Sequence, residues 1–247
     1  MKLAKAKEIA LHRIPDEIFV GHNAISVYIS LSDHAASLNA SHFKDALGSM
    51  QRHSLDAFIL SLCKIYEKPD NRYPNYSIPT AIVYLQEDMT GLHNGIQNHI
   101  KLEQFIQAQI DSSFSVTSGT DLERIPRMIV TWFAERCPQT PPRDGYELDP
   151  VLDALKVLRD KRVAHHEDND LQGLSKTDLD SALRLLAFAQ TFVDLVGYGF
   201  FGFSMNSIAS PETFAPNKSI VWSQMQKLLK ILEQGAPLDR RDAPGSQ

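Results

Sequence analysis

Four side chains that can bind an anion or move a proton lie close together in the stretch LRDKRVAHHEDND, residues 158–170. They are Arg159, Arg162, His165 and His166. At about 100° per residue on an ideal helix, Arg159 and His166 lie about 20° apart around the axis, whereas His165 lies about 120° from Arg159. Apolar residues precede them on the same line of the helix. The spacing therefore predicts a buried stripe that becomes cationic towards the helix end.

This combination of side chains suits the cleavage of an RNA phosphodiester without a metal ion. A histidine that titrates near neutral pH can take the proton from a ribose 2′-hydroxyl. A guanidinium can hold the phosphate through two hydrogen bonds and stabilise the charge that develops on its oxygens. Lys156, Lys161 and Arg162 add positive charge nearby and would bind the RNA backbone.

Two other interpretations of the stretch stay open at the level of sequence. Cations near a helix C-terminus are favoured there by the helix dipole alone, and exposed ion pairs with neighbouring carboxylates would contribute roughly 0.2–1 kcal/mol each. The segment HHEDND also offers imidazoles and carboxylates to a metal ion. Adjacent histidines on a helix diverge by about 100°, however, so they are poorly placed to share one ion. We therefore predict no metal site and no cofactor.

Composition limits the kind of partner that the protein can have. The chain has 247 residues and a net charge of −5, so RNA would have to be drawn by a local basic patch. The two cysteines, Cys63 and Cys137, lie far apart and outside any CxxC spacing, which favours a reducing compartment. No apolar run is long enough to cross a bilayer, and the charged N-terminus shows no signal-peptide pattern. These features predict a cytoplasmic protein with no membrane partner.

Apolar residues recur mostly at three- and four-residue spacing, which predicts an all-α fold. Helices are expected over residues 15–31, 42–68, 78–88, 92–110, 121–137, 148–166, 176–196 and 219–234. Ser77 is a good N-cap for the third of these, with Pro79 in its first turn. The same segment, IPTAIVYLQED, also fits a buried strand, because its short apolar run has no decisive period.

The order of these elements predicts one main domain. We expect a helical bundle over residues 1–200 and a C-terminal helical extension over residues 201–234. The last residues, 235–247, are rich in charged and small residues and are expected to form a disordered tail.

The motif LRDKRVAHHED resembles the signature of HEPN domains, which is an arginine, a polar residue and then a histidine, with four to six residues between the arginine and the histidine. The segment SLDAFILSLCKIYEKPDNRYPNYSIPTAIVYL is similar to a second region of the AbiU-type HEPN family, which is associated with phage abortive infection. The resemblance covers roughly residues 15–200. It implies an up-and-down helical bundle that pairs as a homodimer and, in active members, a metal-independent RNase.

By this resemblance Arg159 binds the phosphate, Asp160 is the polar residue that follows it, and His165 is the general base. The helical wheel instead favours His166, so both histidines stay candidates. Glu167 stands where some HEPN toxins carry a tyrosine that a partner enzyme modifies, so that form of control is not expected.

The expected function is that of a metal-independent endoribonuclease, acting in phage defence or as the toxin of a toxin–antitoxin system. Its partners would be an RNA substrate, a second copy of the chain and a cognate antitoxin protein. The alternative is a non-catalytic bundle that binds protein or RNA, in which the arginine and the histidine have structural or binding roles.

Overall fold

The computed structural model describes residues 2–70, 72, 75–139, 149–161, 176–202 and 220–233. The segments with apolar residues at three- and four-residue spacing form helices in it. Every regular element in these ranges is a helix, so the predicted all-α fold is confirmed. The elements are α1 (Lys2–Glu8), η1 (Ile9–Arg13), α2 (Ile14–Asp33), α3 (Ala35–Asn39), α4 (Lys44–Ile65), α5 (Ile78–Gln86), α6 (Met89–Asn94), α7 (His99–Gln109), α8 (Gly119–Arg136), α9 (Asp149–Arg159), α10 (Lys176–Phe192), η3 (Val193–Phe200) and α11 (Ile220–Glu233).

The ambiguous segment after Ser77 forms a helix, and the strand alternative is wrong. The Ser77 side chain accepts a hydrogen bond from the backbone N–H of Thr80 at 3.3 Å, and Pro79 lies in the first turn. Most side chains of α5 are buried all round the helix, which explains why the sequence shows no clear period there.

One predicted helix is in fact two. The segment expected to be helical over residues 92–110 is interrupted between α6 and α7, where the backbone N–H groups of Gln97 and Asn98 both donate to the carbonyl oxygen of Gly199, at 2.8 and 3.0 Å. The Asn98 side chain then caps α7 by accepting from the N–H of Lys101 at 3.0 Å. A contact with a distant residue thus ends one helix and begins the next.

The chain is already helical well before residue 15, where no helix is predicted. The π-helix η1 joins α1 to α2 without a break. Pro15 in the first turn of α2 lacks an N–H, and its ring would collide with the carbonyl of the preceding turn in a regular α-helix. A π-type turn over Ile9–Arg13 relieves that collision and ends on Arg13.

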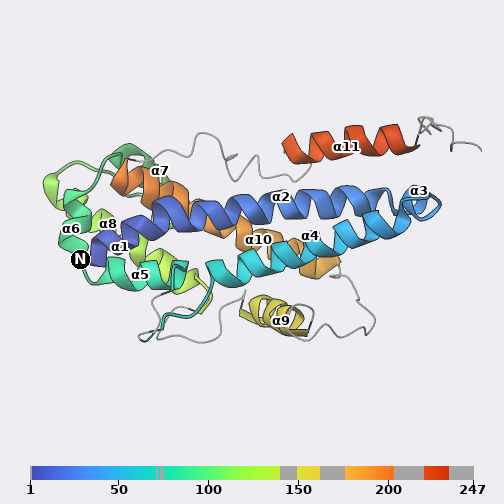
Figure 1. Ribbon diagram of the computed structural model, residues 1–247. Helices are drawn as coiled ribbons and strands as arrows, with labels where there is room; N and C mark the ends of the chain where they lie inside the picture. The colour runs from blue at the N-terminus through green and yellow to red at the C-terminus, as the bar shows by residue number, and fades with distance from the viewer. Residues whose placement is uncertain are drawn as a thin grey trace, which may run out of the picture. The chain divides into compact units, whose positions relative to one another are not determined.

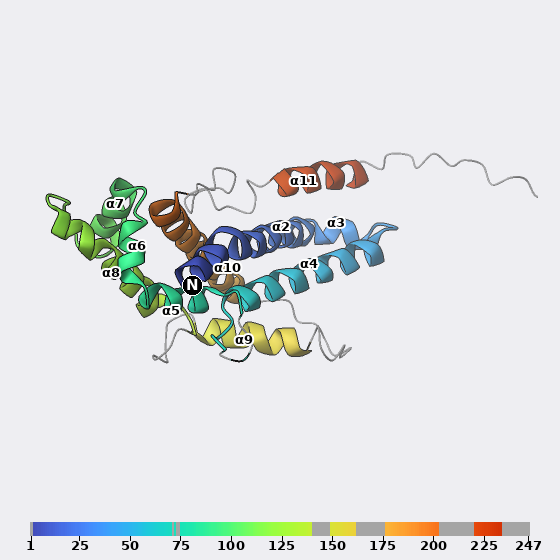
Figure 2. The same ribbon diagram turned by 60° about the vertical axis from the view of Figure 1, so that its left-hand side comes forward.

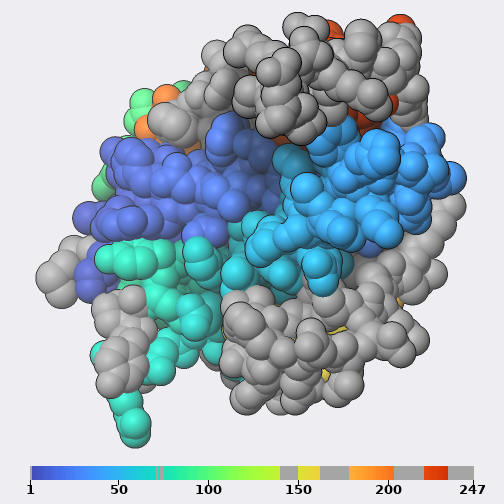
Figure 3. Space-filling model, turned by 45° about the vertical axis from the view of Figure 1, so that its right-hand side comes forward, coloured from blue at the N-terminus to red at the C-terminus, as the bar shows by residue number. Residues whose placement is uncertain are grey.

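The chain divides into two compact units, and the first combines the described residues of Met1–Gly21 and Asp56–Phe214. Within this unit α1 packs along α5, and α5, α6 and α7 each pack on α8 (Figures 1 and 2). In the space-filling view the turquoise surface that includes α5 adjoins the dark blue surface of the N-terminal helices (Figure 3). The predicted domain boundaries at residues 200 and 234 stay predictions.

Aromatic side chains fill the centre of the first unit. The Phe133 ring is 1% exposed and packs edge-on against Trp132, Phe188 and Phe192, with ring centroids 5.1–5.5 Å apart. The buried Tyr66 hydroxyl donates to the carbonyl oxygen of Leu185 at 2.5 Å, which ties the end of α4 to α10. Burial with its one polar atom satisfied is a favourable setting for a tyrosine.

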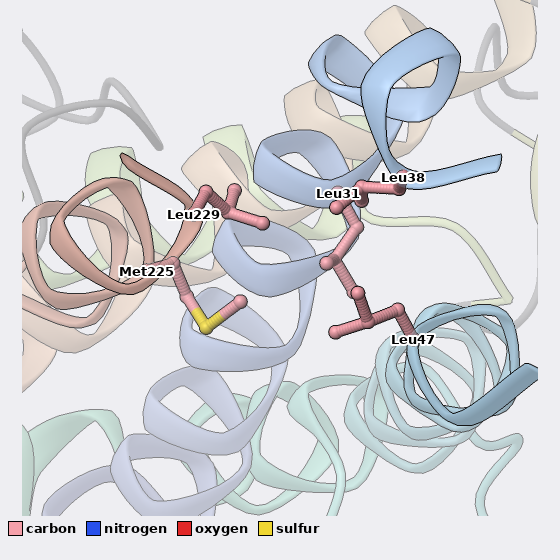
Figure 4. Packing of buried hydrophobic residues seen from close by; sticks show 5 residues of the cluster. All are labelled: Leu31, Leu38, Leu47, Met225 and Leu229. Atoms are coloured by element: carbon pink, nitrogen blue, oxygen red, sulfur yellow. The ribbon is translucent and has the colours of Figure 1, made fainter. Parts of the chain in front are cut away.

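The second unit combines the described residues of His22–Leu55 and Ala215–Gln247. Its core joins leucines from α2, α3 and α4 to two residues of α11 (Figure 4): Leu31, Leu38, Leu47, Met225 and Leu229. A hydrogen bond of 2.8 Å from the Gln51 side-chain amide to the Ser32 hydroxyl ties α4 to α2 beside this core. The predicted C-terminal helix therefore forms, and Met225 and Leu229 on one of its faces are buried within the same unit.

A matched pair of glycine substitutions tests the packing of these helices. A Cβ atom on Gly199 would overlap the Leu102 side chain, coming within 2.8 Å of its Cγ, whereas a Cβ on Gly48 of α4 would meet no atom within 4 Å. Leu102 is fully buried and has little room to move. We expect Gly199→Ala to destabilise the protein by about 1–3 kcal/mol and Gly48→Ala to stabilise it by roughly 0.5–1 kcal/mol.

Urea unfolding followed by circular dichroism measures both variants. Equal stability of Gly199→Ala and the parent would contradict the close approach of η3 to α7.

Candidate functional site

The cationic helix end found in the sequence belongs to α9, which packs on α10. Leu152 and Leu155 are buried at 0% and 1% exposure and fix which face of α9 points inward. Arg159 follows four residues after Leu155, on the same face, in the last turn of the helix. Its side chain is 36% exposed, so the buried stripe reaches a partly open guanidinium, as the sequence predicts.

The Arg159 guanidinium is held by its sequence neighbour. Its Nε and one terminal nitrogen both donate to the same carboxylate oxygen of Asp160, at 2.8 and 2.7 Å. This hydrogen-bonded pair raises the pKa of Arg159 above its ordinary value, so the guanidinium stays charged throughout the working pH range. The side chain of Asp160 is 57% exposed, and its contact with Arg159 fits an orienting partner.

Arg159 lies at the wall of a pocket of about 850 Å³ in the first unit. The end of α9, the end of α4 with the segment that follows it, and the junction of η1 with α2 supply the lining. Five of its lining residues are cations: Arg13, Lys64, Lys68, Lys156 and Arg159. A volume of this size lies within the range of sites that hold small ligands.

Some of these cations already have counter-charges, and others do not. The Lys64 ammonium is 2.9 Å from the Glu17 carboxylate. Among the described residues, neither Lys68 nor Lys156 forms an ion pair within 4.0 Å. Burial lowers the pKa of Lys156, and the neighbouring charge of Lys68 adds to that effect, while Asp153 opposes it. A half-buried ammonium beside other cations would be stabilised by a bound anion.

The pocket also contains a thiol that is not a nucleophile at neutral pH. Cys63 is 4% exposed, and burial raises the pKa of its thiol to about 11, although the charges of Arg159 and Lys156 act in the opposite direction. A protonated, buried thiol has little nucleophilic character. The cations near Cys63 therefore do not activate its thiol, and they remain candidates for binding a ligand.

An exposed aromatic residue also lines this pocket. Tyr76 is 46% exposed, and the guanidinium carbon of Arg13 lies 4.7 Å from the centre of its ring. Neither residue is predicted from the sequence. Tyr76 lies in the polar loop before Ser77, where apolar periodicity carries no information, and Arg13 is presented by a π-helical turn that a 3.6-residue period cannot anticipate.

The predicted site residues fall into three groups. Lys156 and Arg159 are brought together on the pocket wall. Asp160 and Lys161 are exposed, and neither is among the residues that line the pocket. The remaining candidates are outside the described residues: Arg162, His165 and His166. Their predicted roles stay predictions.

Comparisons of the chain with protein-family models, with curated proteins and with solved structures gave no match. The expected membership of the HEPN family thus rests on the resemblance of the two sequence segments.

Two further features of the described residues bear on the class of site. In the part of the chain that the structure describes, no group of three or more His, Cys, Asp and Glu side chains is placed to hold a metal ion. The HHEDND tract, residues 165–170, lies outside that part. No helix among the described residues has both the length and the apolar character needed to span a bilayer.

Proposed function

We propose that the protein is a metal-independent endoribonuclease in which Arg159 holds the scissile phosphate and His165 is the general base, with His166 as the second candidate. One observation supports it above the others. A partly buried guanidinium lies at the wall of a nucleotide-sized pocket, beside Lys156 and Lys68, which have no ion-pair partner among the described residues. These three cations would attract the phosphate of a polyanion, although the pocket is also lined by four carboxylates and the chain has a net charge of −5.

In the proposed reaction the ribose 2′-hydroxyl gives its proton to the histidine while its oxygen attacks the phosphorus. The bond from phosphorus to the 5′-oxygen breaks, and that oxygen leaves as a hydroxyl after taking a proton from solvent. The upstream fragment then ends in a 2′,3′-cyclic phosphate. The guanidinium of Arg159 stabilises the charge on the phosphate oxygens during the attack.

The biological setting follows from the same resemblance. We assign the nuclease to phage defence or to a toxin–antitoxin system in the cytoplasm, where a cognate antitoxin protein would hold it in check. Two chains would pair as a homodimer and bring two cationic helix ends together. Pairing would double the local positive charge available to RNA.

The experiment is incubation of the purified protein with single-stranded RNA in the presence of EDTA. We expect fragments whose 3′ ends, by mass spectrometry, are one water lighter than a 3′-phosphate. RNA with a 2′-fluoro group at every ribose should remain intact, because it lacks the attacking oxygen. Activity that disappears with EDTA would point instead to a metal-dependent hydrolase using the HHEDND tract.

A non-catalytic interaction module is the second candidate. It is favoured by the two hydrogen bonds that already occupy Arg159, since a guanidinium fixed by Asp160 is also a common structural device. On this proposal RNA stays intact when mixed with the protein, and substitution of Arg159 leaves RNA unchanged.

A further inference from the structure

Hydrogen bonds on both sides of Tyr76 hold the loop that presents this exposed ring to the pocket. The Ser77 hydroxyl donates to the carbonyl oxygen of Glu67 at 2.7 Å, and the Asn75 side-chain amide donates to the carbonyl oxygen of Lys68. The Thr80 hydroxyl in turn donates to Asn75. These bonds attach the residues on either side of Tyr76 to the segment that follows α4 and to the start of α5, so the backbone at Tyr76 is held in place before a ligand binds.

The Arg13 guanidinium covers part of the Tyr76 ring, and nearly half of the residue stays exposed. The guanidinium is also 3.6 Å from the Glu8 carboxylate. A tyrosine stiffened in this way by a cation is an efficient platform for a flat ligand, because little side-chain freedom is lost on stacking. Tyr76 lines the same pocket as Lys156 and Arg159.

The pocket therefore combines an aromatic platform with a cationic wall. A nucleic-acid base has a π-face that stacks on aromatic rings, and the phosphate next to it is an anion. Four carboxylates also line the pocket: Asp16, Glu17, Glu67 and Asp70. Glu17 pairs with Lys64, and Arg159 is bonded to Asp160 beside the pocket, whereas half-buried Lys156 has no ion pair among the described residues. Lys156 is consequently the cation that gains most from a phosphate.

We propose that Tyr76, backed by Arg13, is the stacking platform for a base of single-stranded RNA whose phosphate lies against Lys156 and Arg159. The choice of RNA as the polymer rests on the proposed function. A single strand is required because a base inside a duplex is covered on both faces by its neighbours and cannot stack on a protein ring. Tyr76 thus becomes a binding residue that selects unpaired segments.

The experiment uses a short single-stranded 2′-fluoro RNA that carries 2-aminopurine, whose fluorescence is quenched when the base stacks. This probe cannot be cleaved through a 2′-hydroxyl, so it reports binding alone. We expect the parent protein to quench it, Tyr76→Ala to weaken binding by roughly 5- to 100-fold with loss of quenching, and Tyr76→Phe to behave as the parent. Phe43→Ala removes an exposed aromatic ring that does not line the pocket and should change nothing.

If Tyr76→Ala binds the single-stranded probe as tightly as the parent does, the proposed stacking platform is wrong. It is also wrong if the parent binds the single strand and a duplex of the same sequence with equal affinity. Cleavage of unmodified RNA in EDTA is measured in parallel with the same protein. If cleavage persists while binding is independent of Tyr76, the platform alone has failed. If the parent neither binds the probe nor cleaves RNA, both proposals have failed.

Discussion

Arg159→Ala is expected to slow RNA cleavage by roughly two to three orders of magnitude, the usual cost of removing one donor from a developing oxyanion. Arg159→Lys keeps the charge but cannot form two parallel hydrogen bonds with a phosphate, so it should restore only part of the rate. Single-turnover cleavage of a labelled RNA measures both variants. The fold should be retained, because the Arg159 side chain is 36% exposed in the last turn of α9 and bonds to its sequence neighbour Asp160.

His165→Ala should lower the same rate by roughly 10²- to 10⁴-fold. If the two residues act on one transition state, the double variant should be little slower than the worse single variant.

The matched control is Arg124→Ala, which removes an arginine that is 57% exposed on α8 and does not line the pocket. Undiminished cleavage by Arg159→Ala would contradict the role of Arg159 as the phosphate-binding residue, whereas RNA left intact by the parent would leave the interaction module. A large loss with His166→Ala but not with His165→Ala would identify the base instead as the histidine that the helical wheel favours.

Phe133→Ala is expected to lower the stability of the first unit by about 3–5 kcal/mol, the cost of removing a buried aromatic ring. The ring is 1% exposed and touches the aromatic side chains of three helices, α7, α8 and α10. Its removal therefore leaves a cavity whose walls belong to different elements and cannot easily close. Thermal unfolding followed by circular dichroism should show a fall in Tm of roughly 6–20 °C for a unit of this size.

Phe19→Ala is the control for that experiment, because Phe19 is 59% exposed on α2. We expect its stability to stay within about 0.5 kcal/mol of the parent. Phe133→Leu should fall between the two, since it keeps part of the buried volume. An unchanged Tm for Phe133→Ala would mean that the aromatic cluster does not hold these helices together.

The sequence allowed the helical fold to be predicted because most elements bury one face at a regular period. In α4, for example, Leu55, Phe58, Ile59 and Leu62 recur at helical spacing along one face, and all four are buried. The predictions failed where distant residues decide the local structure. The break between α6 and α7 depends on the carbonyl of Gly199, about a hundred residues further along the chain, and no window of the sequence shows it.

Two residues of the candidate pocket could be predicted for the same reason, while the predicted roles of Arg162, His165 and His166 stay predictions. Lys156 and Arg159 share a helix whose orientation is fixed by two buried leucines, so their joint approach to the pocket follows from spacing. Arg13 and Tyr76 come from a π-helical turn and a loop, where spacing carries no such information. The loop offered one local signal, the N-cap Ser77, which fixes where α5 begins and hence where Tyr76 is anchored.

The core of the second unit joins the early helices α2, α3 and α4 to α11, which lies close to the end of the chain. During synthesis Leu31, Leu38 and Leu47 leave the ribosome long before Met225 and Leu229 have been translated. Contacts between residues so far apart in sequence close late and slowly. In that interval the three leucines form an exposed hydrophobic surface on the nascent chain. A chaperone can bind such a surface until α11 has been translated.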